Sequence, residues 1–102
     1  MKECCARYLS EQFGGDADVM NEIYGEYVSS IREKLTEADA ALASGGWQQL
    51  DRVAHTIKGN AFASGDEEMA ETAISLRSAS QLQDGGQVAE LIARLKELEK
   101  TL

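Results

Sequence analysis

The chain has 102 residues and a formal net charge of −8, from 18 acidic and 10 basic side chains. This length suits one domain with one hydrophobic core. Such a negative balance repels phosphate backbones and anionic lipid, and the basic residues do not cluster, so we expect no binding of nucleic acid or of membrane surfaces. No apolar stretch approaches the ~18 to 20 residues that cross a bilayer, and the N-terminus lacks the apolar core of a signal peptide, which predicts a cytoplasmic protein.

The composition favours an all-α fold. Proline is absent, apolar residues make up 43% of the chain, and no run is rich in β-branched and aromatic residues. Glycines divide the sequence into five segments with helical periodicity, and these breaks are Gly14-Gly15, Gly45-Gly46, Gly65 and Gly85-Gly86. The two cysteines, Cys4 and Cys5, are adjacent, so they neither bridge easily nor have zinc-site spacing, and we expect reduced thiols and no metal.

The first two predicted helices differ in length. Residues 3–13 place Cys5, Leu9 and Phe13 on one face. After Gly15, Asp16 is a favourable N-cap, and an apolar stripe from Met20 to Leu42 continues a second helix to Ser44. At 1.5 Å per residue this second helix is roughly 40 Å long.

Three more helices complete the predicted fold. The third runs from Trp47 to Ala63, and its inward-facing residues are Leu50, Val53, Ala54, Ile57 and Ala61. The fourth begins after Gly65 with Asp66 as N-cap, and its apolar line is Met69, Ala73, Leu76, Ala79 or Ser80, and Leu82. The fifth carries Val88, Leu91, Ile92, Leu95, Leu98 and Leu102. Short loops between such helices predict an antiparallel four-helix bundle with a short extra N-terminal helix, in one domain over residues 1–102.

The only histidine, His55, lies on the outer face of the third helix. On a helical wheel it falls about 140° from the core stripe, and Gly59 and Phe62 lie about 40° and 20° from it. Arg52 and Lys58 each lie about 60° to one side. Gly59 is informative because a glycine in a helix interior costs about 1 kcal/mol relative to alanine, and no turn or cap requires one here.

These side chains suit the handling of a phosphoryl group. An exposed imidazole is largely neutral at pH 7, so a ring nitrogen has a lone pair for attack. Lys58 and Arg52 can meet the negative charge of a phosphoryl group, and Gly59 removes a side chain that would keep a partner away. Neither a nucleophile elbow nor a metal-ligand set accompanies the histidine, which argues against a hydrolase triad or a metal centre.

The run His55-Thr56-Ile57-Lys58-Gly59-Asn60 resembles the His-x-x-Lys-Gly-[Ser/Asn] signature of the histidine-containing phosphotransfer (HPt) domain. Similar features extend over nearly the whole chain. They are Tyr8-Leu9, Phe13-Gly14-Gly15-Asp16, the stripe from Met20 to Leu42, and Gly65, Met69, Ala73 and Leu76.

The resemblance implies a phosphorelay intermediate with no enzymatic turnover of its own. His55 would accept a phosphoryl group from the aspartyl phosphate of one receiver domain, in a response regulator or hybrid histidine kinase, and pass it to another receiver. Lys58 would stabilise the phosphohistidine, and Gly59, Asn60 and Phe62 would meet the receiver. The family has no cofactor or metal of its own, because Mg²⁺ and the acidic pocket belong to the receiver.

One position departs from the family pattern. The family often has an acidic or amide residue directly after the leucine matching Leu76, facing the histidine, and here that residue is Arg77. Arg77 would add positive charge beside the phosphoryl group, or it would be a surface arginine paired with Asp51 or Glu71. Gln81, one turn further, could instead offer the imidazole an amide partner.

An alternative function is a helical adaptor that docks or sequesters a receiver without using the histidine chemically. His55, Lys58 and Gly59 together favour the phosphocarrier, because an adaptor has no use for an imidazole beside a cation. Dimerisation through the leucine-rich last helix is a weaker alternative, since those leucines close the bundle, and we expect a monomer.

Overall fold

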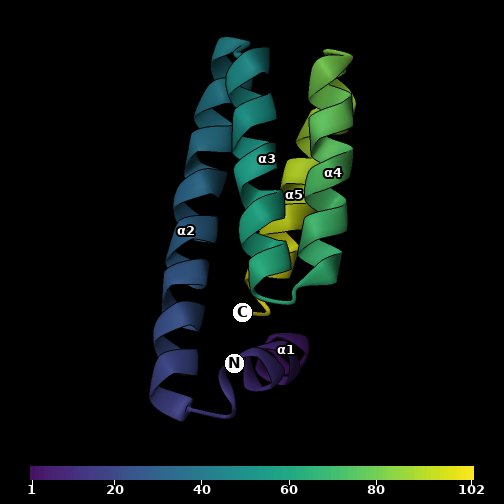
Figure 1. The fold of residues 1–102 in the computed structure, drawn as a ribbon. Coiled ribbons are helices and arrows are strands. Elements are labelled where there is room, and N and C mark those ends of the chain that lie inside the picture. The colour runs from purple at the N-terminus through teal and green to yellow at the C-terminus, as the bar shows by residue number, and fades with distance from the viewer.

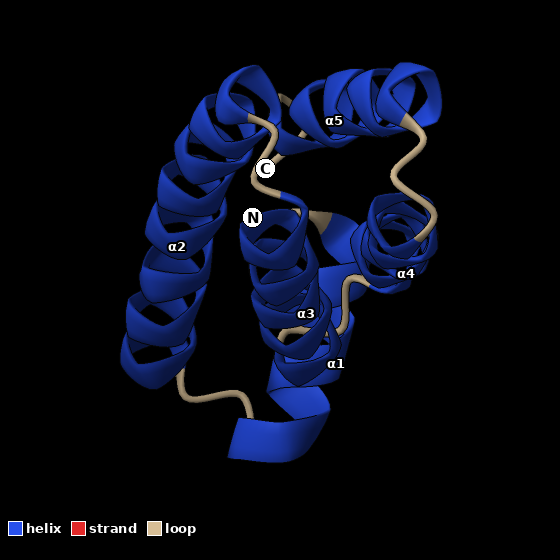
Figure 2. Ribbon diagram, turned by 90° about the horizontal axis from the view of Figure 1, so that it is seen from above, coloured by secondary structure: helices blue, strands red, loops and turns tan.

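The computed structural model describes all 102 residues and contains five helices and no strand (Figures 1 and 2). The helices are α1 (Glu3–Phe13), α2 (Ala17–Ser44), α3 (Trp47–Ala63), α4 (Glu67–Gln81) and α5 (Gly85–Glu99). The predicted all-α class is therefore confirmed. None of the helices combines the length and the apolar character needed to span a membrane.

Aspartates begin three of the helices. The Asp16 carboxylate accepts hydrogen bonds from the backbone N–H groups of Asp18 and Val19, Asp66 caps α4 through Met69, and Asp84 caps α5 through the N–H of Gln87. These contacts satisfy N–H groups that have no partner within the helix. The break predicted at Gly85-Gly86 is present but lies earlier, between Gln81 and Gly85, because Asp84 caps α5 and both glycines lie in its first turn.

Helices α2 to α5 form an antiparallel bundle (Figure 1). α2 and α4 each pack against both α3 and α5. The four helices and α1, which adds Cys5 and Leu9, form one cluster of 22 buried hydrophobic residues. All five inward positions predicted for α3 are buried. Phe13 and Leu82 were expected to face inward but are 42% and 78% exposed. Each lies at the C-terminal end of its helix, where the chain turns away from the core.

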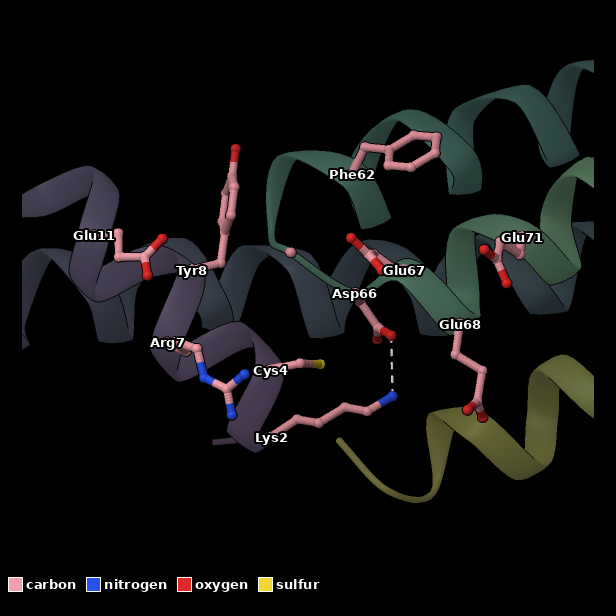
Figure 3. Close-up of a pocket in the computed structure, with 11 residues that line it drawn as sticks. Lys2, Cys4, Arg7, Tyr8, Glu11, Phe62, Asp66, Glu67, Glu68 and Glu71 are labelled. Atoms are coloured by element: carbon pink, nitrogen blue, oxygen red, sulfur yellow. Dashed lines mark hydrogen bonds and ion pairs between the residues drawn. The ribbon is translucent and has the colours of Figure 1, made fainter.

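Helix α1 lies across one end of the bundle, beside the turn between α3 and α4 (Figure 1). It is held there by Asp66, which is fully buried. The Lys2 ammonium lies 3.0 Å from the Asp66 carboxylate, and the Tyr27 hydroxyl donates a 2.8 Å hydrogen bond to the same group. Figure 3 shows Lys2 extending from the start of α1 to Asp66. Both residues line a groove of about 650 Å³. The Tyr24 hydroxyl donates to the carbonyl of Leu102, which ties the C-terminus to the same end.

Gly65 permits the close approach of α1. Its φ is +75°, a left-handed conformation that side chains other than hydrogen disfavour. A Cβ at this position would lie 2.3 Å from the Cβ of Tyr8, which is far inside van der Waals contact. Any larger residue at position 65 would therefore push α1 away from the bundle.

Candidate functional site

His55 lies near the middle of α3, with its side chain exposed to solvent. Ala54 and Ile57 are fully buried and fix the inner face of α3 in the core. The outer face is therefore presented in one orientation. The predicted outward placement of His55 agrees with the structure.

The only two unpaired cations of the chain flank this histidine. Eight of the 10 basic side chains form ion pairs with carboxylates, and these eight are Lys2, Arg7, Arg32, Lys34, Arg77, Arg94, Lys96 and Lys100. Arg52 and Lys58 have no carboxylate oxygen within 4.0 Å. They lie three residues before and three residues after His55. In a chain with a net charge of −8, the positive charge that is free to meet an anion is thus concentrated on one helix around His55.

Gly59 leaves the backbone of α3 open one turn after His55. A Cβ built on Gly59 would meet no atom within 4 Å, so no neighbour within the chain requires a glycine there. Gly25, in the interior of α2, is equally open. The missing side chain at Gly59 provides space next to the histidine for another molecule.

Arg77 reaches His55 from α4. Its Nε donates a hydrogen bond to Asp51 Oδ1 over 3.0 Å, and its Nη1 lies 3.4 Å from Nδ1 of the His55 ring. Arg77 therefore pairs with Asp51, which was one of the two alternatives expected for it, and it also lies beside the imidazole. Its expected action on a phosphoryl group stays a prediction. Gln81 donates from Nε2 to the same Asp51 oxygen over 3.1 Å, so its amide does not contact the ring.

Asn60 has an intramolecular partner. Its Nδ2 donates a 2.6 Å hydrogen bond to Oγ of Ser30, which joins α3 to α2. This side chain is directed at α2, on the other flank of α3 from Arg77. The docking role expected for Asn60 stays a prediction, and the structure gives it less support than it gives Gly59.

Two exposed apolar side chains accompany the histidine. Phe62, two turns after His55, is 47% exposed, as expected for a docking residue. Ile74 on α4 is 43% exposed and was not predicted. Because α3 and α4 are antiparallel and bring His55 opposite Arg77, the same register places Ile74 opposite Lys58. The sequence signal was its position three residues before Arg77, on the same flank of α4.

We use the name α3–α4 face for the surface formed by Asp51, His55, Lys58, Gly59, Phe62, Ile74, Arg77 and Gln81. It combines the His55 imidazole, Arg77 in contact with that ring, Lys58 without a carboxylate partner, two exposed apolar side chains, and the open backbone at Gly59. The structure contains no group of three or more His, Cys, Asp or Glu side chains that could hold a metal ion.

The model of one protein family, described as the Hpt domain, matches residues 22–101. The chain belongs to the Hpt domain family. Hpt domains have a phosphotransfer role in two-component signalling, in which they act as phosphocarriers and interact with receiver domains. The match begins within α2, so α1 lies outside it. Comparisons with curated proteins and with solved structures gave no match.

Proposed function

We propose that this Hpt domain is a phosphorelay intermediate in which His55 carries the phosphoryl group between two receiver domains. The observation that carries the proposal is the pairing pattern of the cations. Eight are bound to carboxylates, and the two free ones, Arg52 and Lys58, flank the only histidine. A phosphoryl group on His55 would bring negative charge to the place where the chain has positive charge available.

The chemistry is a nucleophilic exchange at phosphorus. A ring nitrogen of His55 attacks the phosphorus of an aspartyl phosphate with its lone pair, and the bond between phosphorus and the aspartyl oxygen breaks. The carboxylate leaves with the electron pair, and the ring loses a proton to water. Transfer to the second receiver reverses these steps, with the imidazole as the leaving group and the second aspartate as the nucleophile.

The surroundings of His55 support close docking of a folded partner. Gly59 offers bare backbone, while Phe62 and Ile74 offer apolar surface on either helix of the α3–α4 face. Exposed apolar side chains beside polar and charged ones are typical of interaction sites. An Hpt domain that only held a receiver would need this surface but not a histidine between free cations.

A two-step transfer assay tests the proposal. A receiver carrying a labelled aspartyl phosphate is first mixed with the protein. The protein is then purified away from this receiver and mixed with a second, unlabelled receiver. We expect label on the Hpt protein after the first step and on the second receiver after the second. His55→Gln should keep the helical circular-dichroism signal and accept no label. Binding of receivers without any transfer would instead support the adaptor function.

A further inference from the structure

The contact between Arg77 and His55 restricts the proton on the imidazole ring. A guanidinium has five N–H donors and no acceptor. Nη1 of Arg77 lies 3.4 Å from Nδ1 of His55, so Nδ1 accepts and carries no proton while this contact lasts. In the neutral ring the remaining proton is then on Nε2.

Asp51 keeps the guanidinium in this position. It lies one turn before His55 on α3, and its Oδ1 accepts from Arg77 Nε over 3.0 Å and from Gln81 Nε2 over 3.1 Å. Asp51 and Arg77 are both partly buried, with side chains 30% and 38% exposed. Nε of Arg77 is thus bound to the Asp51 carboxylate, while its Nη1 lies against the His55 ring.

We propose that Asp51 is a positioning residue, which holds Arg77 on Nδ1 of His55 and thereby slows both phosphorylation at Nε2 and hydrolysis of the resulting phosphohistidine. This inference rests on the proposed function. It assigns a role to Asp51 and gives Arg77 a specific site of action, the ring nitrogen that does not carry the phosphoryl group. With Asp51 and Arg77 in place, phosphoryl transfer to His55 is slower and the phosphohistidine lasts longer.

The slower phosphorylation follows from the position of the ring proton. For Nε2 to attack phosphorus with its lone pair, the proton of the neutral ring must be on Nδ1. Arg77 must therefore leave Nδ1 before the bond between Nε2 and phosphorus forms and the aspartyl oxygen departs. After the attack the Nδ1 proton passes to water, and Arg77 can donate to Nδ1 again.

The slower hydrolysis follows from the same contact. Hydrolysis is fast when a proton from water adds to Nδ1, because the ring then leaves as neutral imidazole with the electron pair of the phosphorus–nitrogen bond on Nε2. Water attacks phosphorus and inorganic phosphate is released. A guanidinium on Nδ1 occupies the lone pair and opposes the incoming positive charge, so this protonation becomes rarer.

Other charges near the ring set a competing expectation. Asp51, Arg52 and Lys58 lie within about one turn of it on α3, and Arg77 contacts it from α4. The α2 side chains Lys34 and Glu37 line a hollow on the far side of Arg52, which that hollow includes. If Asp51 acted only through its own negative charge, removing that charge would make ring protonation harder and hydrolysis slower. If it acts by positioning Arg77, removing it makes hydrolysis faster. The two roles therefore predict opposite signs.

The test uses the unphosphorylated protein first. ¹⁵N NMR of the imidazole reports which nitrogen carries the proton, and it needs no receiver. We expect the proton on Nε2 in the wild type and a shift of population towards Nδ1 in both Arg77→Gln and Asp51→Asn. Asp51→Glu should restore the wild-type spectrum. Arg94→Gln, which breaks the exposed Arg94–Glu68 pair between α5 and α4, is the matched control and should change nothing.

The second measurement is the lifetime of phosphohistidine made chemically with phosphoramidate. We expect hydrolysis at neutral pH to be about tenfold faster in Arg77→Gln than in the wild type, which is the effect expected for losing a hydrogen bond from a charged group. Hydrolysis should also be faster in Asp51→Asn than in the wild type. Slower hydrolysis in Asp51→Asn, or a wild-type ring protonated on Nδ1, would overturn the inference. Failure of receivers to phosphorylate His55 would count against the proposed function alone, because neither measurement uses a receiver.

Discussion

At the scale of single residues, the neighbours of His55 determine what it can do. An exposed imidazole on a helix is common. Here it lies between two cations without carboxylate partners, beside open backbone at Gly59, and in contact with Arg77. Spacing along one helix predicted the two neighbouring cations and the open backbone at Gly59, but not that the cations lack carboxylate partners. The sequence offered an ion pair with Asp51 and a place beside the histidine site as alternatives for Arg77. It could not predict that Arg77 contacts Asp51 and the ring at the same time, because that depends on the register between α3 and α4.

Substitutions at Gly59 should separate stability from docking. Gly59→Ala should raise the free energy of unfolding by about 1 kcal/mol, since alanine is the better helix former and the added Cβ meets no neighbour. Gly59→Glu should fold, while its larger, charged side chain blocks phosphoryl transfer from a receiver. Urea denaturation and the transfer assay measure the two effects.

Gly25 provides the matched control for these substitutions, because it is also open and lies inside a helix away from His55. Gly25→Ala and Gly25→Glu should change stability in the same way as their counterparts at position 59 and leave transfer intact. Unimpaired transfer in Gly59→Glu, or equal loss in Gly25→Glu, would refute the docking role of Gly59.

The two cysteines should differ strongly in reactivity. Cys5 is fully buried, and burial, followed by the neighbouring Cys4 and Asp66, raises the pKa of its thiol to about 12. Because the thiolate is the reactive form, Cys5 should not react with a thiol reagent in the folded protein, whereas the partly exposed Cys4 should. We expect one fast-reacting thiol, which Cys4→Ser removes. A fast reaction that persists in Cys4→Ser would contradict this assignment.

At the scale of helices, the sequence predicted the bounds of α1, α2 and α3 but misplaced the break between α4 and α5. Asp16 and Asp66 were predicted as N-caps and accept the expected backbone hydrogen bonds. The predictions failed at C-terminal ends, where Phe13 and Leu82 keep the helical spacing but no longer face the core. Periodicity describes the face of a helix and carries no information about how far the neighbouring helix extends.

The docking of α1 can be tested at Gly65. Gly65→Ala should destabilise the protein in two ways, through the left-handed φ of +75° and through the clash with Tyr8. Gly45→Ala is the control, because Gly45 has a similar φ of +70° and nothing within 4 Å of the added Cβ. We expect Gly45→Ala to cost about 1–2 kcal/mol and Gly65→Ala to cost about 1–3 kcal/mol more. Equal costs in thermal or urea unfolding would mean that α1 does not pack closely on Gly65.

At the scale of the whole molecule, groups with raised pKa values gather where α1 meets the end of the bundle. Burial lowers the pKa of Lys2, but the hydrogen bond and the charge of Asp66 outweigh this effect and leave the pKa raised above 10.5. Burial raises the pKa of Tyr24 and, together with the hydrogen bond to Asp66, that of Tyr27. These three groups and Cys5 all lie at the end of the bundle that α1 covers.

The raised pKa values predict loss of stability at high pH. The unfolded Cys5 thiol loses its proton near pH 9.0, whereas the folded thiol keeps it to about 12, so the folded state binds more protons in this range. Lys2 and the two tyrosines have the same sign. Their contribution is complete below pH 9.0 and declines as the pH rises towards the folded values. We expect the free energy of unfolding in urea to fall by at least about 2 kcal/mol by roughly pH 11.

A comparison with Cys5→Ala identifies the source of this dependence. Removing the thiol should make the decline shallower above pH 9.0, although the cavity lowers stability at every pH. A free energy of unfolding that stays constant or rises up to pH 11 would show that the proton-binding groups around α1 do not behave as described.

The most direct test of the central claim is to find the residue that carries the phosphoryl group. The protein is incubated with a phosphorylated receiver, kept at alkaline pH, and examined by intact mass and by fragmentation of its peptides. We predict one phosphoryl group per chain on the peptide containing His55, lost after mild acid treatment and absent in His55→Gln. A phosphoryl group on another residue, or none at all despite measurable binding of the receiver, would contradict the assignment of His55 as the phosphoryl carrier.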